Sequence, residues 1–208
     1  MKLNKLFLAL CLFPSLLSAQ QYGLEVEVVN EDIGVLVGAL GSTDLTGYTC
    51  YRAYITMQNE DDFLSSISGD AVNPTYITTT TTFSNAALGA VTPNGINSLL
   101  FPVYPDLEFD TWVTIGLDGV PDAAAGEAAV STVQSSSNQW ATALNPGADI
   151  DGSSVAIDDP IGGAWYALNG DANGVAGTEL RVLAGQFVTD GDLSLQFYTQ
   201  IFINGNGL

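Results

Sequence analysis

Three small polar side chains alternate in one short loop, at Asn169, Asp171 and Asn173, and Gly174 follows them directly. Oxygen ligands at the first, third and fifth positions with a glycine at the sixth are typical of a calcium-binding loop. The closing acid is out of register, because Glu179 stands one place before the twelfth position. The flanking residues also resemble strands rather than helices, so an EF-hand is not predicted. Two interpretations stay open: a looser calcium site that uses these side chains, or an Asn/Gly-rich connection between strands.

A second group of acids precedes a tryptophan, in Asp106, Glu108, Asp110 and Trp112. If residues 106–117 form a strand, alternate carboxylates stand roughly 6.5–7 Å apart on one face. That spacing is close to the range of inverting glycoside hydrolases, and Trp112 would stack on a sugar ring. Three interpretations remain: a solvated strand face, a cation site, or acid–base catalysis.

Missing residue types exclude much of enzyme chemistry. The chain has no histidine, and no lysine follows Lys5. Histidine-dependent nucleophiles, histidine-bearing zinc sites and Schiff-base lysines are therefore excluded. We expect Arg52 and Arg181 to pair with carboxylates, and Cys50 to be a buried, unpaired packing residue. Trp140 and Trp165 are predicted to lie in the core.

The first residues have the pattern of a secretory signal peptide. Lys2 and Lys5 precede the apolar run 6–17, and Ser18 and Ala19 supply a small-residue cleavage site. We therefore predict a cleaved leader over 1–19 and a single acidic domain over 20–208. The apolar run is too short for a membrane span, so we expect a secreted or cell-surface protein without membrane insertion.

The remaining charge is strongly negative. All 23 acidic residues lie beyond the predicted leader and only two arginines oppose them, which gives a net charge of −21. Nucleic acid is therefore excluded as a partner. Mutual repulsion opposes compaction unless salt or bound cations offset it.

Alternating apolar residues predict an all-β fold, an antiparallel β-sandwich or jelly-roll-like single domain. Strands are expected over 22–29, 47–57, 75–83 and 106–117, followed by a hairpin of 179–189 and 193–203 around Asp190-Gly191. A short helix is expected from Pro121. The ending "FINGNGL" has two open interpretations: a frayed terminus, or a chain that continues or pairs with a strand from a partner.

The segments "TCYRAYITM", "TTTTTF", "DTWVTIGLDG" and "AGQFVTDGDLS" resemble a secreted β-domain that recurs in Bacteroidota-type cell-surface proteins with type IX secretion. The resemblance implies an extracellular setting and no particular reaction, cofactor or catalytic residue. The sorting domain common in such proteins is not visible after Ile203.

These observations favour an extracellular structural or adhesive binding module, stabilised by calcium if the loop site exists. The alternatives are a carbohydrate-binding module and a carboxylate-based glycoside hydrolase or lyase. The expected partner is an extracellular glycan or protein, and the sequence does not set the oligomeric state.

Overall fold

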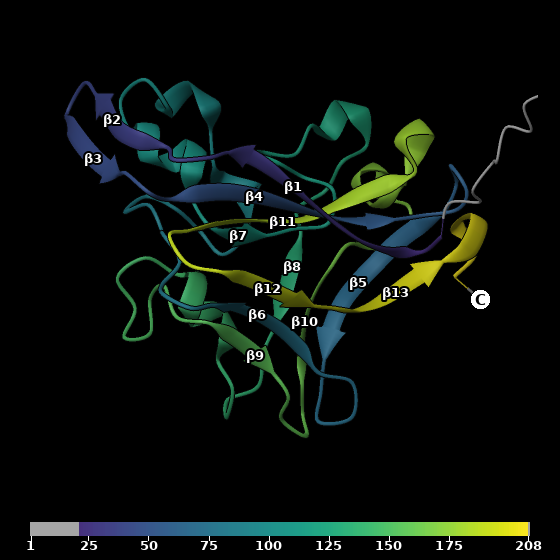
Figure 1. Cartoon of the computed structure of the whole chain (residues 1–208). Coiled ribbons are helices and arrows are strands. Elements are labelled where there is room, and N and C mark those ends of the chain that lie inside the picture. The colour runs from purple at the N-terminus through teal and green to yellow at the C-terminus, as the bar shows by residue number, and fades with distance from the viewer. Residues whose placement is uncertain (1–20, 208) are drawn as a thin grey trace, which may run out of the picture.

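The computed structural model describes residues 21–207, so the predicted leader lies outside the described residues. These residues form thirteen strands in antiparallel sheets, joined by loops and short 3-10 turns (Figure 1). The all-β prediction is confirmed, and the layers are those of a β-sandwich.

The first layer is a four-stranded sheet with the order β1-β4-β11-β7. Its strands are β1 (Gly23–Asn30), β4 (Thr49–Thr56), β11 (Arg181–Thr189) and β7 (Trp112–Val113). Side chains alternate along β4, so that Cys50 and Arg52 lie on the outer face while Ala53 and Ile55 face the core. The prediction for Cys50 is confirmed, and burial raises the pKa of its thiol to about 12.

The second layer consists of two sheets, and one continuous stretch of chain forms an edge strand of each. One is β13 (Tyr198–Phe202), β5 (Phe63–Gly69), β10 (Gly163–Tyr166) and β8 (Ser131–Val133), and the other is β12 (Leu193–Gln196), β6 (Thr75–Thr79) and β9 (Val155–Ile157). The chain from Leu193 to Phe202 pairs first with β6 and then with β5, which joins the two sheets. A separate hairpin of β2 (Gly34–Gly38) and β3 (Gly41–Leu45) extends from the first layer (Figure 1).

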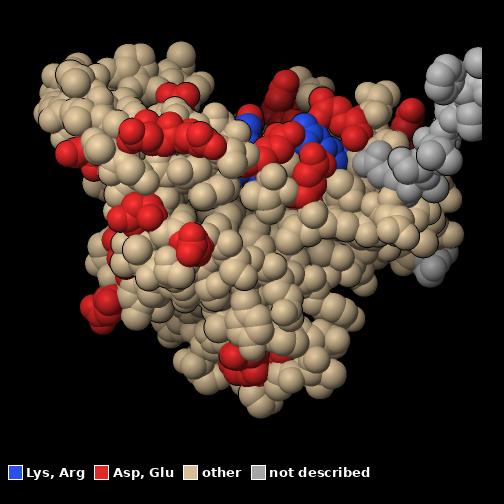
Figure 2. Space-filling model, in the orientation of Figure 1, with Lys and Arg blue, Asp and Glu red and all other residues tan. Residues whose placement is uncertain are grey.

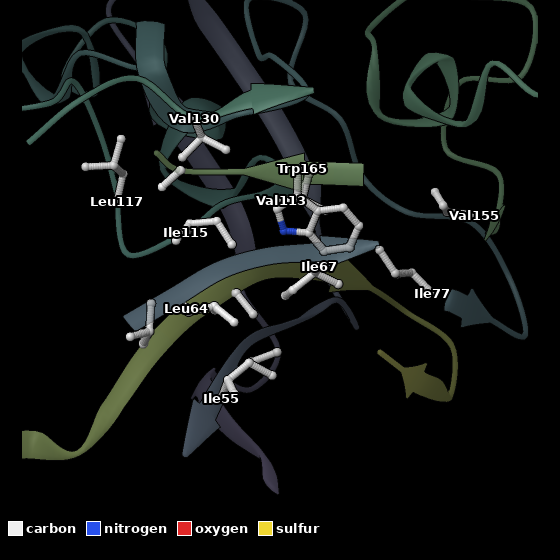
Figure 3. Packing of buried hydrophobic residues seen from close by; sticks show 14 of the residues in the cluster. Ile55, Leu64, Ile67, Ile77, Val113, Ile115, Leu117, Val130, Val155 and Trp165 are labelled. Atoms are coloured by element: carbon white, nitrogen blue, oxygen red, sulfur yellow. The ribbon is translucent and has the colours of Figure 1, made fainter. Parts of the chain in front are cut away.

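The core lies between the layers and is centred on Trp165, whose side chain is fully buried (Figure 3). Its Nε1 donates to the carbonyl of Thr114 at 3.0 Å, and its ring packs against Trp140 and Phe197. Burying each large apolar side chain stabilises the fold by roughly 1.5–3 kcal/mol. The prediction that Trp140 and Trp165 belong to the core is confirmed.

The 3-10 turns lie in the connections. They are η1 (Pro93–Gly95), η2 (Ser98–Leu100), η3 (Pro105–Phe109), η4 (Ala123–Ala125), η5 (Trp140–Leu144), η6 (Ala172–Gly174), η7 (Gly177–Glu179) and η8 (Ile203–Gly205). The helix expected from Pro121 is reduced to η4, because Gly126 takes a left-handed conformation (φ 84°) directly after it.

The predicted hairpin around Asp190-Gly191 is wrong, because β11 and β12 belong to different layers. Hydroxyl groups hold the chain at this crossing: Thr189 Oγ1 lies 2.7 Å from Thr79 Oγ1 and 3.1 Å from Thr81 Oγ1, and it donates to the carbonyl of Thr82. The threonine run 78–82 therefore continues beyond the end of β6 and fixes the corner between the layers.

Candidate functional site

The outer face of the first layer carries a row of polar side chains across four strands. The register places Glu27 opposite Arg52, Arg52 opposite Gln186, and Gln186 opposite Trp112. Arg52 and Gln186 are joined directly, because Arg52 Nε donates to Gln186 Oε1 at 3.2 Å. Residues distant in sequence are thus brought together by strand pairing alone.

An irregularity in β11 is needed for this alignment. The register with β4 shifts between Leu183 and Gly185, which leaves Ala184 as an extra residue. A one-residue shift moves every later side chain to the opposite face of a strand. The bulge therefore keeps Leu183 and Gln186 on the same face. Gly185 is required beside it, since a Cβ atom there would lie 2.9 Å from the carbonyl oxygen of Trp112.

The connection formed by residues 93–109 and 117–120, on either side of β7, covers this row and leaves a pocket of about 400 Å³ between itself and the sheet. Its apolar lining comes from Ile96, Phe101, Leu107 and Trp112, and its polar lining includes Arg52, Glu108, Asp118 and Gln186. Gln186 ties the connection to the sheet, because its amide donates to the carbonyls of Glu108 and Asp110 at 3.0 and 2.9 Å. The volume falls within the roughly 300–1,000 Å³ range of small-molecule sites.

Arg52 is the cation of the pocket. Its side chain is 28 % exposed, and its Nη1 lies 3.7 Å from the carboxylate of the exposed Asp118. A guanidinium has five N–H groups, so the contacts with Gln186 and Asp118 leave donor capacity for a ligand. The predicted pairing of Arg52 with a carboxylate is confirmed.

Arg181 occupies the other end of the same face. Its Nη1 lies 2.6 Å from Glu27 and 3.7 Å from Glu25, its Nε lies 3.3 Å from Glu179, and its guanidinium lies over the Tyr54 ring. The hydrogen bond from Arg181 to Glu27 outweighs burial and raises the pKa of the guanidinium. The pairing predicted for Arg181 is confirmed. Figure 2 shows the basic side-chain atoms of this view (blue) surrounded by acidic residues along the upper part of the molecule.

The strand predicted over 106–117 is wrong for most of its length. Pro105–Phe109 is a 3-10 turn, and only Trp112 and Val113 form a strand. Asp106, Glu108 and Asp110 therefore have separate environments: Asp106 lies in a hollow against β3, Glu108 lines the pocket, and Asp110 is buried. Trp112 was expected on an exposed face, but it is only 2 % exposed because the connection on either side of β7 covers it.

Asp110 is enclosed by the loop of residues 86–90, which lies just before Pro93 in the chain. Its two carboxylate oxygens accept hydrogen bonds from the backbone N–H groups of Ala86 and Ala90 at 2.8 and 3.0 Å. A Cβ atom at Gly89 would collide with this carboxylate. Burial raises the pKa of Asp110 to about 7, although these hydrogen bonds favour the charged form.

The residues predicted for a calcium loop bind different partners in the structure. Asp171 accepts a hydrogen bond from the N–H of Leu168 and closes its own turn, while Glu179 pairs with Arg181. Asn173 is buried, and it bonds the carbonyl of Ile115 and the N–H of Ala128. Asn169 lines a surface hollow beside Phe202. Within residues 21–207, no group of three or more Asp, Glu or Cys side chains is placed to hold a metal ion.

Sequence reasoning missed Gln186, Asp118 and Phe101 as members of the site. Gln186 sits in an apolar strand pattern, and a polar residue among buried neighbours is a signal that could have singled it out. Asp118 and Phe101 lie in the connection, whose path depends on contacts far along the chain. Their place over the sheet has no local sequence signal.

Comparison with protein families, with curated proteins and with solved structures finds no match to the chain. No helix among the described residues has the length and apolar character needed to cross a membrane. The pocket around Arg52 is therefore the feature of the molecule that bears on function.

Proposed function

We propose that this protein is an exported adhesive module that binds a neutral glycan in the pocket over β4, β11 and β7, without catalysing a reaction. The observation that carries the proposal is a pocket that combines the cation Arg52, 3.7 Å from the carboxylate of Asp118, with the carboxylate of Glu108 and the ring of Phe101. Export is supported by the leader pattern of residues 1–19 and by the acidic composition.

A sugar matches the chemistry of this lining. Each sugar hydroxyl both donates and accepts hydrogen bonds, and the pocket offers N–H donors from Arg52 beside the carboxylate acceptors. The half-buried ring of Phe101 suits the C–H face of a sugar ring, whereas Trp112 is almost fully covered and supports the pocket from below. The excess of 23 acidic residues over four basic ones disfavours an anionic ligand, because the field of the protein would repel it.

Binding is favoured over hydrolysis because of the position of the acids. Asp110 has the raised pKa that a catalytic acid needs, but its oxygens are engaged by Ala86 and Ala90 and it is not part of the pocket lining. Asp106 lies in a different hollow.

The test is a screen of neutral mono- and oligosaccharides by glycan array, followed by calorimetric titration of any hit. Arg52→Met is expected to abolish binding, and Glu108→Gln to weaken it about tenfold. The matched control is Glu60→Gln, an exposed glutamate outside the pocket, which should bind as the wild type does. Thermal melts of each variant separate loss of binding from loss of folding.

Three outcomes would contradict the proposal. The first is a screen without a hit, and the second is a hit whose affinity is the same in the wild type and in Arg52→Met. The third is release of a cleaved sugar product, which would replace a binding module by a glycoside hydrolase or lyase.

A further inference from the structure

The inner face of β1 is left partly uncovered by the second layer. The register places Leu24, Val26 and Val28 on the same face as the core residues of β4, opposite Ile55, Ala53 and Tyr51. Ile55 and Ala53 are 3 % and 0 % exposed, whereas Leu24, Val26 and Val28 are 41 %, 44 % and 50 % exposed. The alternation predicted for residues 22–29 is therefore real, but the apolar side of the strand lacks full cover.

A groove lined mostly by apolar side chains, with the carboxylate of Asp192 at one end, follows from this missing cover. Two hollows of about 350 and 210 Å³ adjoin at Leu24 and run between β1 and the edge formed by β12 and β13. Val26, Tyr51 and Leu195 line one end of this groove, and Phe197 and Ile201 line the other. Figure 2 shows few charged atoms on the part of this face below the acid-rich upper layer.

The backbone of β1 is also available for pairing. It is the terminal strand of its sheet, and from Gly23 to Val28 its register with β4 is uninterrupted. Half of the N–H and C=O groups of such an edge strand point away from the sheet. The facing edge is less suited to pairing, since it is broken at Phe197 between β12 and β13 and shifts again between Gln200 and Ile201.

The outer face of the same strand is acidic. Glu25 and Glu27 alternate with the groove residues and, together with Glu179, share the single guanidinium of Arg181. Arg52, opposite Glu27 in the register, pairs with Asp118, so these three carboxylates and Arg181 leave a net charge of −2 beside β1. A strand added to this edge would place alternate side chains in the groove and next to these carboxylates.

We propose that the edge of β1 binds an extended segment of a partner protein in which apolar and basic residues alternate. The segment adds one strand to the first layer, its apolar residues fill the groove beside Leu24 and Val26, and its basic residues face Glu25 and Glu27. This is β-strand addition, in which main-chain hydrogen bonds give affinity and alternate side chains give specificity. It is independent of the pocket around Arg52.

A second copy of this chain is a poor occupant. Antiparallel pairing of two β1 strands about Val26 would bring Glu25 of each copy opposite Glu27 of the other. Like charges directly opposite on neighbouring strands are destabilising. The overall charge of −19 on each copy adds long-range repulsion.

The experiment titrates the protein with a peptide of about eight residues that alternates valine and lysine, matching a typical strand length. Two control peptides alternate valine and glutamate, or keep the valine–lysine composition in two blocks. Binding is followed by fluorescence anisotropy, and hydrogen exchange locates it. The alternating valine–lysine peptide should bind at least about tenfold more tightly than either control and protect backbone amides of β1.

Two further measurements identify a β-ladder. N-methylation of one alternating set of peptide amides should abolish binding, whereas methylation of the other set should leave it unchanged. Val26→Lys should weaken binding at least about tenfold, while Val35→Lys, at an exposed valine of β2, should not. Both variants should melt within about 2 °C of the wild type, because neither side chain is buried: Val26 is 44 % exposed and Val35 58 %.

The proposal is overturned if all three peptides bind equally, if both methylated peptides bind, or if protection falls outside β1. Dimerisation of the protein alone by sedimentation equilibrium would assign the groove to a second copy. Binding to neutral phosphatidylcholine vesicles that Val26→Lys abolishes would assign it to a lipid surface.

Discussion

Arg52 lies directly opposite Gln186 across β4 and β11, and Arg52 Nε donates to Gln186 Oε1 over 3.2 Å. The amide of Gln186 also holds the carbonyls of Glu108 and Asp110. One buried side chain therefore orients the cation of the pocket and anchors the connection that covers it.

Gln186→Leu should lower the free energy of unfolding by about 3 kcal/mol, because two carbonyls that are sheltered from water lose their donor. The variant should also weaken glycan binding, since Arg52 loses the partner of its Nε. Urea unfolding measures the first effect. Gln196→Leu is the control: this exposed glutamine makes one hydrogen bond, to the carbonyl of Pro74, and its loss should cost less than about 1 kcal/mol. Equal losses in the two variants would show that Gln186 does not anchor the connection.

Asp62 links the two ends of the described chain. Its fully buried carboxylate accepts hydrogen bonds from the hydroxyl of Tyr22, the side chain of Asn59 and the backbone N–H of Asn204. Burial alone would raise the pKa of Asp62, but these hydrogen bonds outweigh it and lower the pKa to about 2.

Because this pKa is depressed, Asp62 stabilises the fold above the ordinary aspartate pKa of 3.8, and the contribution is lost as pH falls towards 2. Asp62→Asn should cost about 2 kcal/mol at neutral pH, since the new amide faces hydrogen-bond donors. Its neighbour Asp61 is exposed, so Asp61→Asn is the matched control. If the wild type and Asp62→Asn lose the same stability between pH 4 and pH 2, the assignment is wrong.

The sequence predicted the strands whose pattern comes from burial on one face. The alternating residues 47–57 contain β4, and the apolar run of residues 179–189 contains β11. Prediction from the sequence failed where contacts between residues far apart in the chain decide the structure. Asp106 and Glu108 alternate as in a strand, but Pro105 starts a 3-10 turn and Asp110 binds the loop at Ala86 and Ala90.

The Asp190-Gly191 turn shows the same limit. Asp-Gly between apolar runs is a local hairpin signal, yet the hydroxyl of Thr189 bonds to threonines more than a hundred residues earlier and directs β12 into the other layer. The pocket could not be predicted either. The sequence marks Arg52 and Trp112 as separate features, and only the strand register and the bulge at Ala184 bring them together in one pocket.

Salt should stabilise the protein through screening of its acidic surface. Three side chains of the predicted calcium loop, Asp171, Asn173 and Glu179, are bonded to other groups of the protein. Melting temperatures should therefore rise with sodium chloride, since screening at 0.1 M salt limits charge repulsion to about 10 Å. Calcium and chelator curves should coincide at matched ionic strength. A rise specific to calcium, absent with magnesium, would support the calcium site considered from the sequence.

Asp110 should impose a pH dependence opposite in sign to that of Asp62. Its pKa is about 7 in the fold and 3.8 in the unfolded reference, so between these values the folded protein holds a proton that the unfolded chain has released. The free energy of unfolding therefore falls as pH rises through this window, by up to about 4 kcal/mol.

Asp110→Asn removes this titration, because the amide stays neutral at every pH. The variant loses a constant amount of stability from the contact of its NH₂ group with a backbone N–H. Urea unfolding should nevertheless show that the difference in the free energy of unfolding between the wild type and Asp110→Asn shrinks steadily from pH 4 to pH 7. Asp61→Asn, at an exposed aspartate that is not among the groups acting on Asp110, should keep the wild-type slope. Parallel pH profiles for wild type and Asp110→Asn would mean that the carboxylate is already charged at pH 4, held so by the N–H groups of Ala86 and Ala90.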